Sequence, residues 1–115
     1  MVRICFLCLF LLSIYSCKQK TQIPSNLLDE DKMVEIITQL EITQAYFKIK
    51  SVSPDSISST NHYQKQQFDS IFKQHNISYE AFNNSLMYYA SEPNKIMEIY
   101  SQVVVSLSEQ QASFH

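Results

Sequence analysis

The sequence contains no glycine and no tryptophan, and its 115 residues include only three prolines and three cysteines. Glycine supplies the positive φ angles that tight hairpins, phosphate-binding loops and dinucleotide-binding motifs need, so none of these is expected. Basic residues are also few, because nine Lys and Arg stand against 11 Asp and Glu without forming a basic stripe. Nucleic-acid binding is therefore not expected either.

Patterns typical of catalytic and metal sites are missing as well. The three histidines, His62, His75 and His115, are scattered, and no H-E-x-x-H motif occurs. A G-x-S-x-G nucleophile motif requires glycine, and no serine lies in another nucleophile pattern. A paired-carboxylate glycosidase site is left open, although the chain is small for one. We expect no enzyme, no metal, no bound cofactor and no small-molecule substrate.

The N-terminus has the order of parts found in an export signal. A positive charge at Arg3 precedes an apolar run over residues 4–12, and the small residue Ser16 stands directly before Cys17. The run is shorter than the roughly 20 residues that span a bilayer. With Ile14 three positions before the cysteine, the segment resembles a bacterial lipobox. The alternatives are an ordinary secretory signal or a core helix that contains cysteines.

The lipobox resemblance implies cleavage between Ser16 and Cys17, with residues 1–16 as signal peptide. It also implies a covalent diacylglycerol and an N-acyl chain on Cys17, which would be the only non-protein groups. Cys5 and Cys8 have C-x-x-C spacing, but both lie in the apolar run, where cysteine behaves as a small hydrophobic residue. The 99 residues that remain would then hold one alkylated cysteine and no disulfide.

The predicted lipid would hold the domain close to a membrane. Residues 17–27 form the lipidated cysteine and tether, of which the nine residues after Cys17 reach about 30 Å when fully extended. Surface-exported lipoproteins of some Bacteroidota carry an acidic tract after the cysteine, and this tether has no acidic residue. We therefore expect a cell-envelope location, on the periplasmic face of the outer membrane.

Residues 28–108 predict an all-α domain, a small bundle of about four helices. The helix boundaries come from capping residues: Asp29 begins a helix that runs to Lys50, and Ser78 precedes one over residues 79–90. A Ser-rich loop over residues 51–59 precedes a helix over residues 60–75, which Asn76 closes in the left-handed conformation. Pro93 begins a fourth helix that ends near Ser108, before a frayed tail over residues 109–115.

Helical periodicity assigns a core face to each helix. The short break before Pro93 predicts that the last two helices form a C-terminal antiparallel hairpin. Gln44 falls on the core face of the first helix, either as an amide bonded to a neighbouring helix or as part of a binding crevice. The apolar positions expected to face inward are Met33, Ile36, Ile37, Leu40, Phe47, Phe68, Ile71, Phe72, Phe82, Leu86, Tyr89, Ile96, Ile99, Tyr100, Val103 and Leu107.

Two stretches of the mature chain, residues 28–37 followed by Ala45 and residues 71–100, resemble a known family. The most specific part is the spacing of Phe82, Ser85, Leu86 and Tyr89, followed by Pro93, Tyr100 and Val103. They are similar to the domain-of-unknown-function 4296 family, which comprises small lipoproteins of Bacteroidota. The family usually has glycine where this chain has Asn76, and often an acidic residue where it has Gln44. The resemblance implies location and fold, and it carries no established activity.

Three residues are candidate partner contacts, and one is a candidate modification site. Tyr46 and Tyr88 lie nearly opposite the apolar stripes of their helices, so they are predicted partner contacts together with Gln44. The alternative is that these rings pack on other helices of the bundle. Asp55-Ser56-Ile57 resembles an O-glycosylation triplet of Bacteroidota, which makes Ser56 a candidate; the similar triplet at Ser70 lies in a predicted helix.

We consider two functional hypotheses. The first is a non-catalytic accessory or adaptor subunit that is anchored beside a larger envelope protein. The second is a periplasmic chaperone-like helical binder of unfolded client proteins, suggested by analogy from a capped, aromatic-bearing helix at residues 77–82. A stable one-to-one partner would favour the first hypothesis, whereas binding to many unfolded proteins would favour the second.

Overall fold

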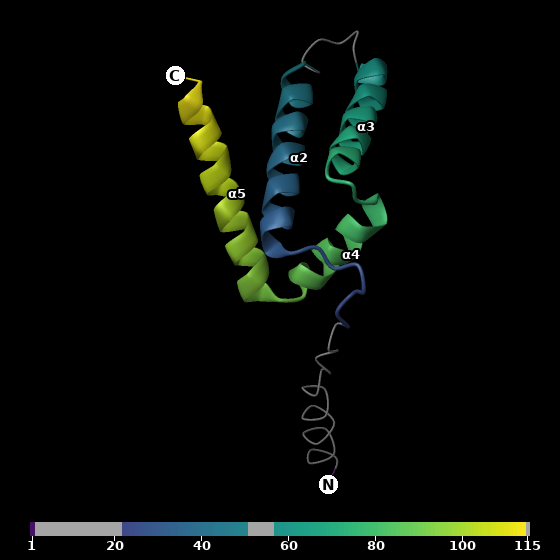
Figure 1. Cartoon of the computed structure of the whole chain (residues 1–115), viewed down its shortest axis with the longest axis vertical. Coiled ribbons are helices and arrows are strands. Elements are labelled where there is room, and N and C mark those ends of the chain that lie inside the picture. Colours follow the sequence, from purple (N-terminus) through teal and green to yellow (C-terminus); the bar gives the residue numbers. More distant parts are fainter. Residues whose placement is uncertain (2–21, 51–56, 115) are drawn as a thin grey trace.

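A computed structural model describes residues 1, 22–50 and 57–114 of the chain. These residues form four α-helices, α2 (Glu30–Lys50), α3 (Ile57–Gln74), α4 (Tyr79–Ala90) and α5 (Pro93–Ser113), and the described part contains no strand. The helices pack into a bundle, so the predicted all-α fold is confirmed (Figure 1). Within the same residues, no helix combines the length and hydrophobicity that crossing a bilayer requires.

Local capping interactions explain the helix boundaries that the sequence predicted. Asp29 Oδ1 accepts a hydrogen bond of 2.7 Å from the backbone N–H of Lys32 and so caps α2. Ser78 Oγ accepts one of 3.0 Å from Ala81 N–H at the start of α4. Pro93 occupies the first turn of α5, where its missing N–H leaves no helical bond unmade.

Asn76 ends α3 as predicted, in the left-handed conformation with φ 53°. Its N–H donates to the carbonyl of Lys73 and the N–H of Ile77 donates to the carbonyl of Phe72, both over 3.0 Å. This pair of bonds is the Schellman motif that glycine usually closes. The chain therefore makes its sharp α3–α4 turn without any glycine.

Two predicted boundaries were wrong by several residues. The helix α3 begins at Ile57 rather than Thr60, because serines are only mildly unfavourable in helices and no proline follows Pro54 in this stretch. The helix α5 continues to Ser113 rather than ending near Ser108. Its additional residues, Glu-Gln-Gln-Ala, favour helix, and neither glycine nor proline interrupts them.

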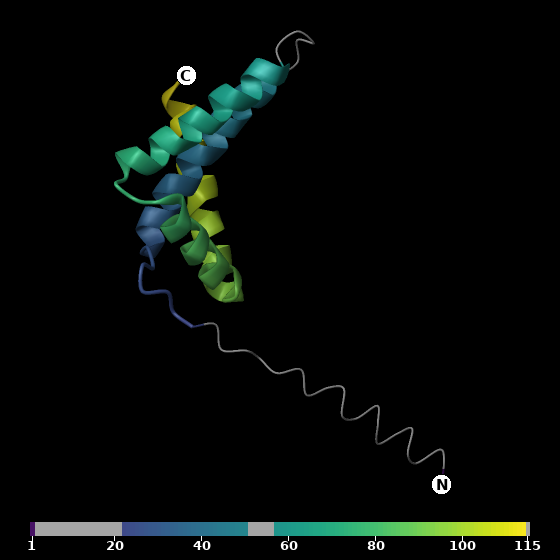
Figure 2. The same cartoon turned by 90° about the vertical axis from the view of Figure 1, so that its right-hand side faces the viewer.

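The helix α2 lies at the centre of the bundle, with α3 along one side, α5 along the other and α4 across the base (Figures 1 and 2). Its opposite faces both contribute to one continuous core. The buried apolar members of that core are Met33, Val34, Ile36, Ile37, Ile71, Phe72, Phe82, Tyr88, Tyr89, Ile99 and Val103.

The helices α4 and α5 form the C-terminal hairpin, but α5 packs more extensively on α2 than on α4. The reason is length, because α4 has 12 residues, about 18 Å, whereas the 21 residues of α5 extend about 31 Å. Toward its C-terminus α5 diverges from α2 (Figure 1), and among residues 104–114 no side chain is buried. Tyr100, predicted to face the core, is 44% exposed at the edge of this contact.

Candidate functional site

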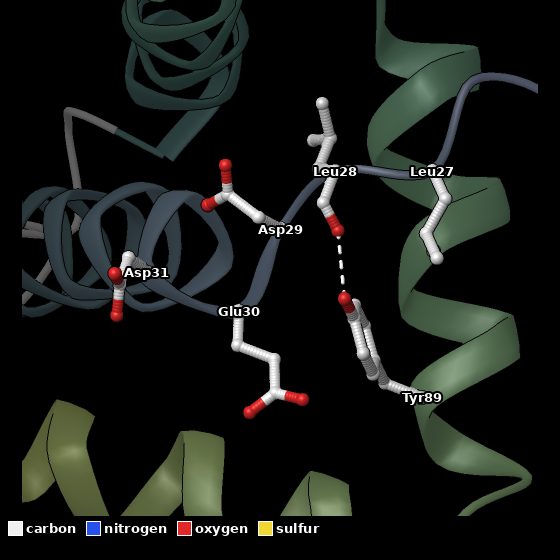
Figure 3. A pocket seen from close by; sticks show the side chains of 6 residues that line it. All are labelled: Leu27, Leu28, Asp29, Glu30, Asp31 and Tyr89. Atoms are coloured by element: carbon white, nitrogen blue, oxygen red, sulfur yellow. Dashed lines mark hydrogen bonds between the residues drawn. The ribbon is translucent and has the colours of Figure 1, made fainter.

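The backbone of Leu28, just before α2, is held by two side chains from α4. Its N–H donates to Ser85 Oγ over 2.9 Å, and its carbonyl accepts a 2.8 Å bond from the Tyr89 hydroxyl (Figure 3). Ser85 in turn donates to the carbonyl of Ala81 over 2.7 Å. We call this arrangement the Leu28 clamp. It fixes the point at which the N-terminal segment leaves the helical body.

Helical geometry places both clamp side chains on one face of α4. Ser85 and Tyr89 are four residues apart, so they lie one turn above the other on the side facing α2. Ser85 is fully buried and Tyr89 is 3% exposed. Ser85 uses its hydroxyl both as acceptor and as donor, so its polar group is satisfied despite its burial.

The environment of Tyr89 keeps its hydroxyl in the donor form. Burial raises the pKa of Tyr89 above its ordinary value of 10.0, and the negative charges of Glu30 and Asp29 raise it further. Both effects disfavour the phenolate, because it would lose hydration and face two carboxylates. The phenol therefore remains protonated at neutral pH and can donate to the Leu28 carbonyl.

An open groove of about 560 Å³ borders the Leu28 clamp. Three carboxylates lie along it, but each begins α2, where negative charge stabilises the positive end of the helix dipole. Glu30 is additionally 3.9 Å from the ammonium of Lys95 on α5. The groove is lined by Leu27, Leu28, Asp29, Glu30, Asp31 and Tyr89 (Figure 3).

A second, smaller groove of about 240 Å³ lies between α2 and α3. Next to it, Nε2 of the half-buried His75 is 3.1 Å from Oε1 of Gln39, and Nδ1 is 3.7 Å from a carboxylate oxygen of Glu35. The groove contains no ionisable side chain, since its lining is Gln39, Ile42, Thr43, Gln67, Ser70, Ile71 and Gln74.

Among residues 22–50 and 57–114, no three His, Cys, Asp or Glu side chains come close enough together to hold a metal ion. Three polar residues of the grooves form helix-capping or tertiary hydrogen bonds: Asp29, Gln39 and Tyr89. Their arrangement stabilises the fold and orients the N-terminal segment.

The sequence that forms this fold matches a known protein family. The model of the domain of unknown function DUF4296 matches residues 24–113, which contain all four helices and the Leu28 clamp. The chain belongs to the DUF4296 family. No curated protein and no solved structure matches the chain. In this DUF4296 domain, the Ser85 and Tyr89 spacing that carried the resemblance coincides with the two clamp side chains.

The predicted partner contacts of the DUF4296 domain have different outcomes. Tyr46 points outward as predicted, because it is 52% exposed near the end of α2. Its ring packs edge-on against Phe47 at 5.4 Å, and the ammonium of Lys50 lies 5.0 Å from the ring centre. Tyr46 therefore remains a candidate for contact with another protein.

The prediction that Tyr88 points outward was wrong. Tyr88 is 9% exposed and belongs to the core, where its ring meets Tyr89 edge-on at 5.4 Å. The ammonium of Lys95 lies 5.9 Å from the ring centre. Because α4 contacts both α2 and α5, this short helix buries two faces, and the side opposite the first apolar stripe is covered too.

The prediction that Gln44 lies on a covered face was also wrong. Gln44 is exposed, although it continues the helical face of Ile37 and Leu40. The described part of the chain leaves this side chain uncovered, although Phe47, three residues further along α2, is buried. Gln44 lines neither of the two grooves described above.

Three predicted site residues, Ser16, Cys17 and Ser56, lie outside the described residues. Ser85 is the functional residue that periodicity alone missed, since only apolar positions were counted toward the core. A small polar residue between Phe82 and Tyr89 on an apolar face was the available signal. Its partner is a backbone amide 57 positions away, which no local pattern reveals.

Proposed function

We propose that this DUF4296 protein is a lipid-anchored, non-catalytic subunit of the cell envelope. It would serve as an accessory or adaptor for a larger protein at the periplasmic face of the outer membrane. The observation that carries the proposal is the Leu28 clamp, in which buried side chains of α4 secure the residue where a tether enters the body. The clamp would give a domain that is tethered through its N-terminus a fixed attachment point.

The sequence supports the anchor. The apolar run ending in Ser16-Cys17 has the order of a lipoprotein signal, and the segment between Cys17 and Leu28 is short. Two or three acyl chains hold a protein on a bilayer almost permanently, because each buried methylene contributes about 0.8 kcal/mol. The domain would then work within a few tens of Å of the membrane surface.

The exposed end of α2 is the proposed partner surface. Ile42, Tyr46 and Ile49 are 39%, 52% and 76% exposed and follow one helical stripe. This end of α2 lies opposite the end at which residues 22–28 leave the body (Figure 1). A tyrosine offers a large apolar face and a polar tip with little loss of rotamer entropy, which suits contact with another protein.

The anchor is tested by labelling cells with palmitate. The wild-type chain should incorporate label and lose its first 16 residues, whereas Cys17→Ala should do neither. Ser16 and the apolar run remain in this variant, so export itself is not removed. Labelled and processed Cys17→Ala protein would disprove lipidation at this cysteine.

The adaptor role is tested by mild detergent extraction and mass spectrometry of what co-purifies. We expect one stoichiometric envelope protein, and we expect Tyr46→Ala to reduce its recovery while leaving the fold intact. Tyr63→Ala is the control, because Tyr63 is a similarly exposed tyrosine on α3, at 58%. Recovery of many unfolded outer-membrane proteins in place of one partner would favour the chaperone-like binder and contradict the adaptor role.

A further inference from the structure

The C-terminal half of α5 stands away from the bundle (Figure 1). Among residues 104–114 no side chain is buried, and Val104 and Phe114 are 61% and 87% exposed. An isolated helical segment shorter than about 12–15 residues is only marginally stable in water. A further contact along this segment would therefore stabilise it.

Six residues of α5 and its C-cap follow a coiled-coil spacing; five of them are exposed, and Leu107 is half-buried beside the core. Their separations alternate between three and four residues, which places them on one stripe beside the buried Ile99 and Val103. In heptad terms, Val104 occupies an a position and Leu107 the following d position. We call this set the α5 outer stripe: Met97, Tyr100, Val104, Leu107, Gln111 and Phe114.

The charge pattern around the stripe fits a second copy of the same chain. Between residues 99 and 114 the only charged residue is Glu109, five positions after Val104 and on the other side of the helix. The stripe edge that faces away from the core carries the small, uncharged Ser101 and Ser108. Two copies would therefore bring no like charges together, and the stripe has none of the flanking charges with which helices discriminate between different partners.

We propose that α5 pairs in parallel with α5 of a second copy through the α5 outer stripe. A β-branched residue at a followed by Leu at d, here Val104 and Leu107, favours two-stranded parallel coiled coils. In that register Gln111 faces Gln111 of the other copy, and two amides can bond to each other. The parallel direction rests on the proposed function, because it sends both N-terminal segments toward one membrane (Figures 1 and 2).

The expected dimer is weak in solution and depends on concentration. The stripe from Met97 to Phe114 is about 27 Å long, so the pairing buries less than the roughly 800 Å² per partner of a typical stable interface. Anchoring both copies in one membrane would raise their effective concentration. The full chain in detergent solution should therefore change from one copy to two as its concentration rises to about 0.1 mM.

Two neighbouring valines provide a matched pair of variants for sedimentation in detergent. Val104→Glu places a carboxylate in each copy at the centre of the stripe and should weaken self-association by at least about tenfold. Val105→Glu adds the same charge at a residue that is 53% exposed on a different side of α5, and it should leave self-association unchanged. Far-ultraviolet circular dichroism verifies that both variants remain helical.

Each result bears on one part of the proposal. A chain that stays monomeric at every concentration, or equal loss in both variants, would overturn the dimer. The Cys17→Ala chain should still dimerise. A wild-type chain that incorporates no palmitate but still dimerises would contradict only the proposed anchor. With p-benzoylphenylalanine in place of Phe114, irradiation should cross-link the C-terminal half of α5 in both copies. A cross-link near Met97, or to a different protein, would refute the parallel pairing.

Discussion

Replacing Ser85 by alanine tests whether the Leu28 clamp holds the N-terminal segment to the body. The substitution removes the acceptor for the Leu28 N–H, and a buried donor without a partner costs about 1–3 kcal/mol. Alanine recovers about 0.5 kcal/mol through its higher helix propensity. Since Leu28 is only half-buried, we expect a net loss of about 1.5 kcal/mol, or about 6–12 °C in melting temperature for a domain of this size.

The control for Ser85→Ala is Ser108→Ala. Ser108 also donates to the carbonyl four residues earlier, over 2.8 Å to Val104, but it is exposed and accepts no bond from a distant residue. Loss of the Ser108 hydroxyl should change the free energy of unfolding by less than about 0.5 kcal/mol. The measurement is thermal unfolding of the full chain in one detergent, followed by circular dichroism, with native-state exchange of the Leu28 amide as a second readout.

Tyr89→Phe and Ser85→Ala together form a double-mutant cycle that tests the two hydrogen bonds to Leu28. The Leu28 carbonyl borders the open groove, so water can partly replace the phenol, and we expect a loss of about 0.5–1.5 kcal/mol. The two losses should not be additive, because both bonds hold one peptide segment. If Ser85→Ala cost no more than Ser108→Ala and left the exchange of Leu28 unchanged, the clamp would not stabilise the domain.

Three further predictions concern the core, the α3–α4 turn and pH. Phe82→Ala should cost about 3–5 kcal/mol in urea unfolding, and Leu86→Ala less, because Phe82 is 7% exposed and Leu86 only half-buried. Asn76→Gly should leave the melting temperature nearly unchanged, whereas Asn76→Val should lower the stability by at least about 1 kcal/mol, because φ is 53°. The pKa of Tyr89 in the folded state is raised above its ordinary value of 10.0. The protonated phenol therefore contributes fully to stability below pH 10.0, and this contribution is lost as the pH rises further. Tyr89→Phe should reduce this loss of stability at high pH.

Each of these three has an outcome that would contradict it. Equal losses at Phe82 and Leu86 would mean that the two side chains are similarly buried. A large stabilisation by Asn76→Val would be incompatible with a left-handed residue at this turn. Identical stability profiles for wild type and Tyr89→Phe from about pH 8 to about pH 11 would show that ionisation of Tyr89 does not affect folding.

Local chemistry in the sequence determined most of the helix boundaries. Asp29, Ser78 and Pro93 act on backbone groups within one helical turn of themselves, and Asn76 closes α3 through its own backbone conformation. Such interactions depend on neighbours in the chain, so reading the residues in order is sufficient to find them. The same holds for the apolar stripes of Met33, Ile99 and other core residues, which follow helical periodicity.

The tertiary structure alone decided which helix covers which face. Gln44 and Tyr88 show this in opposite directions. Gln44 is exposed although it lies on an apolar face of α2, whereas Tyr88 is buried although it lies opposite the apolar stripe of α4, because α4 contacts both α2 and α5. The Leu28 clamp likewise joins residues 57 and 61 positions apart. Helical periodicity defines angles around one axis, whereas burial depends on the distance to another helix, and that distance is set only when all four helices pack together.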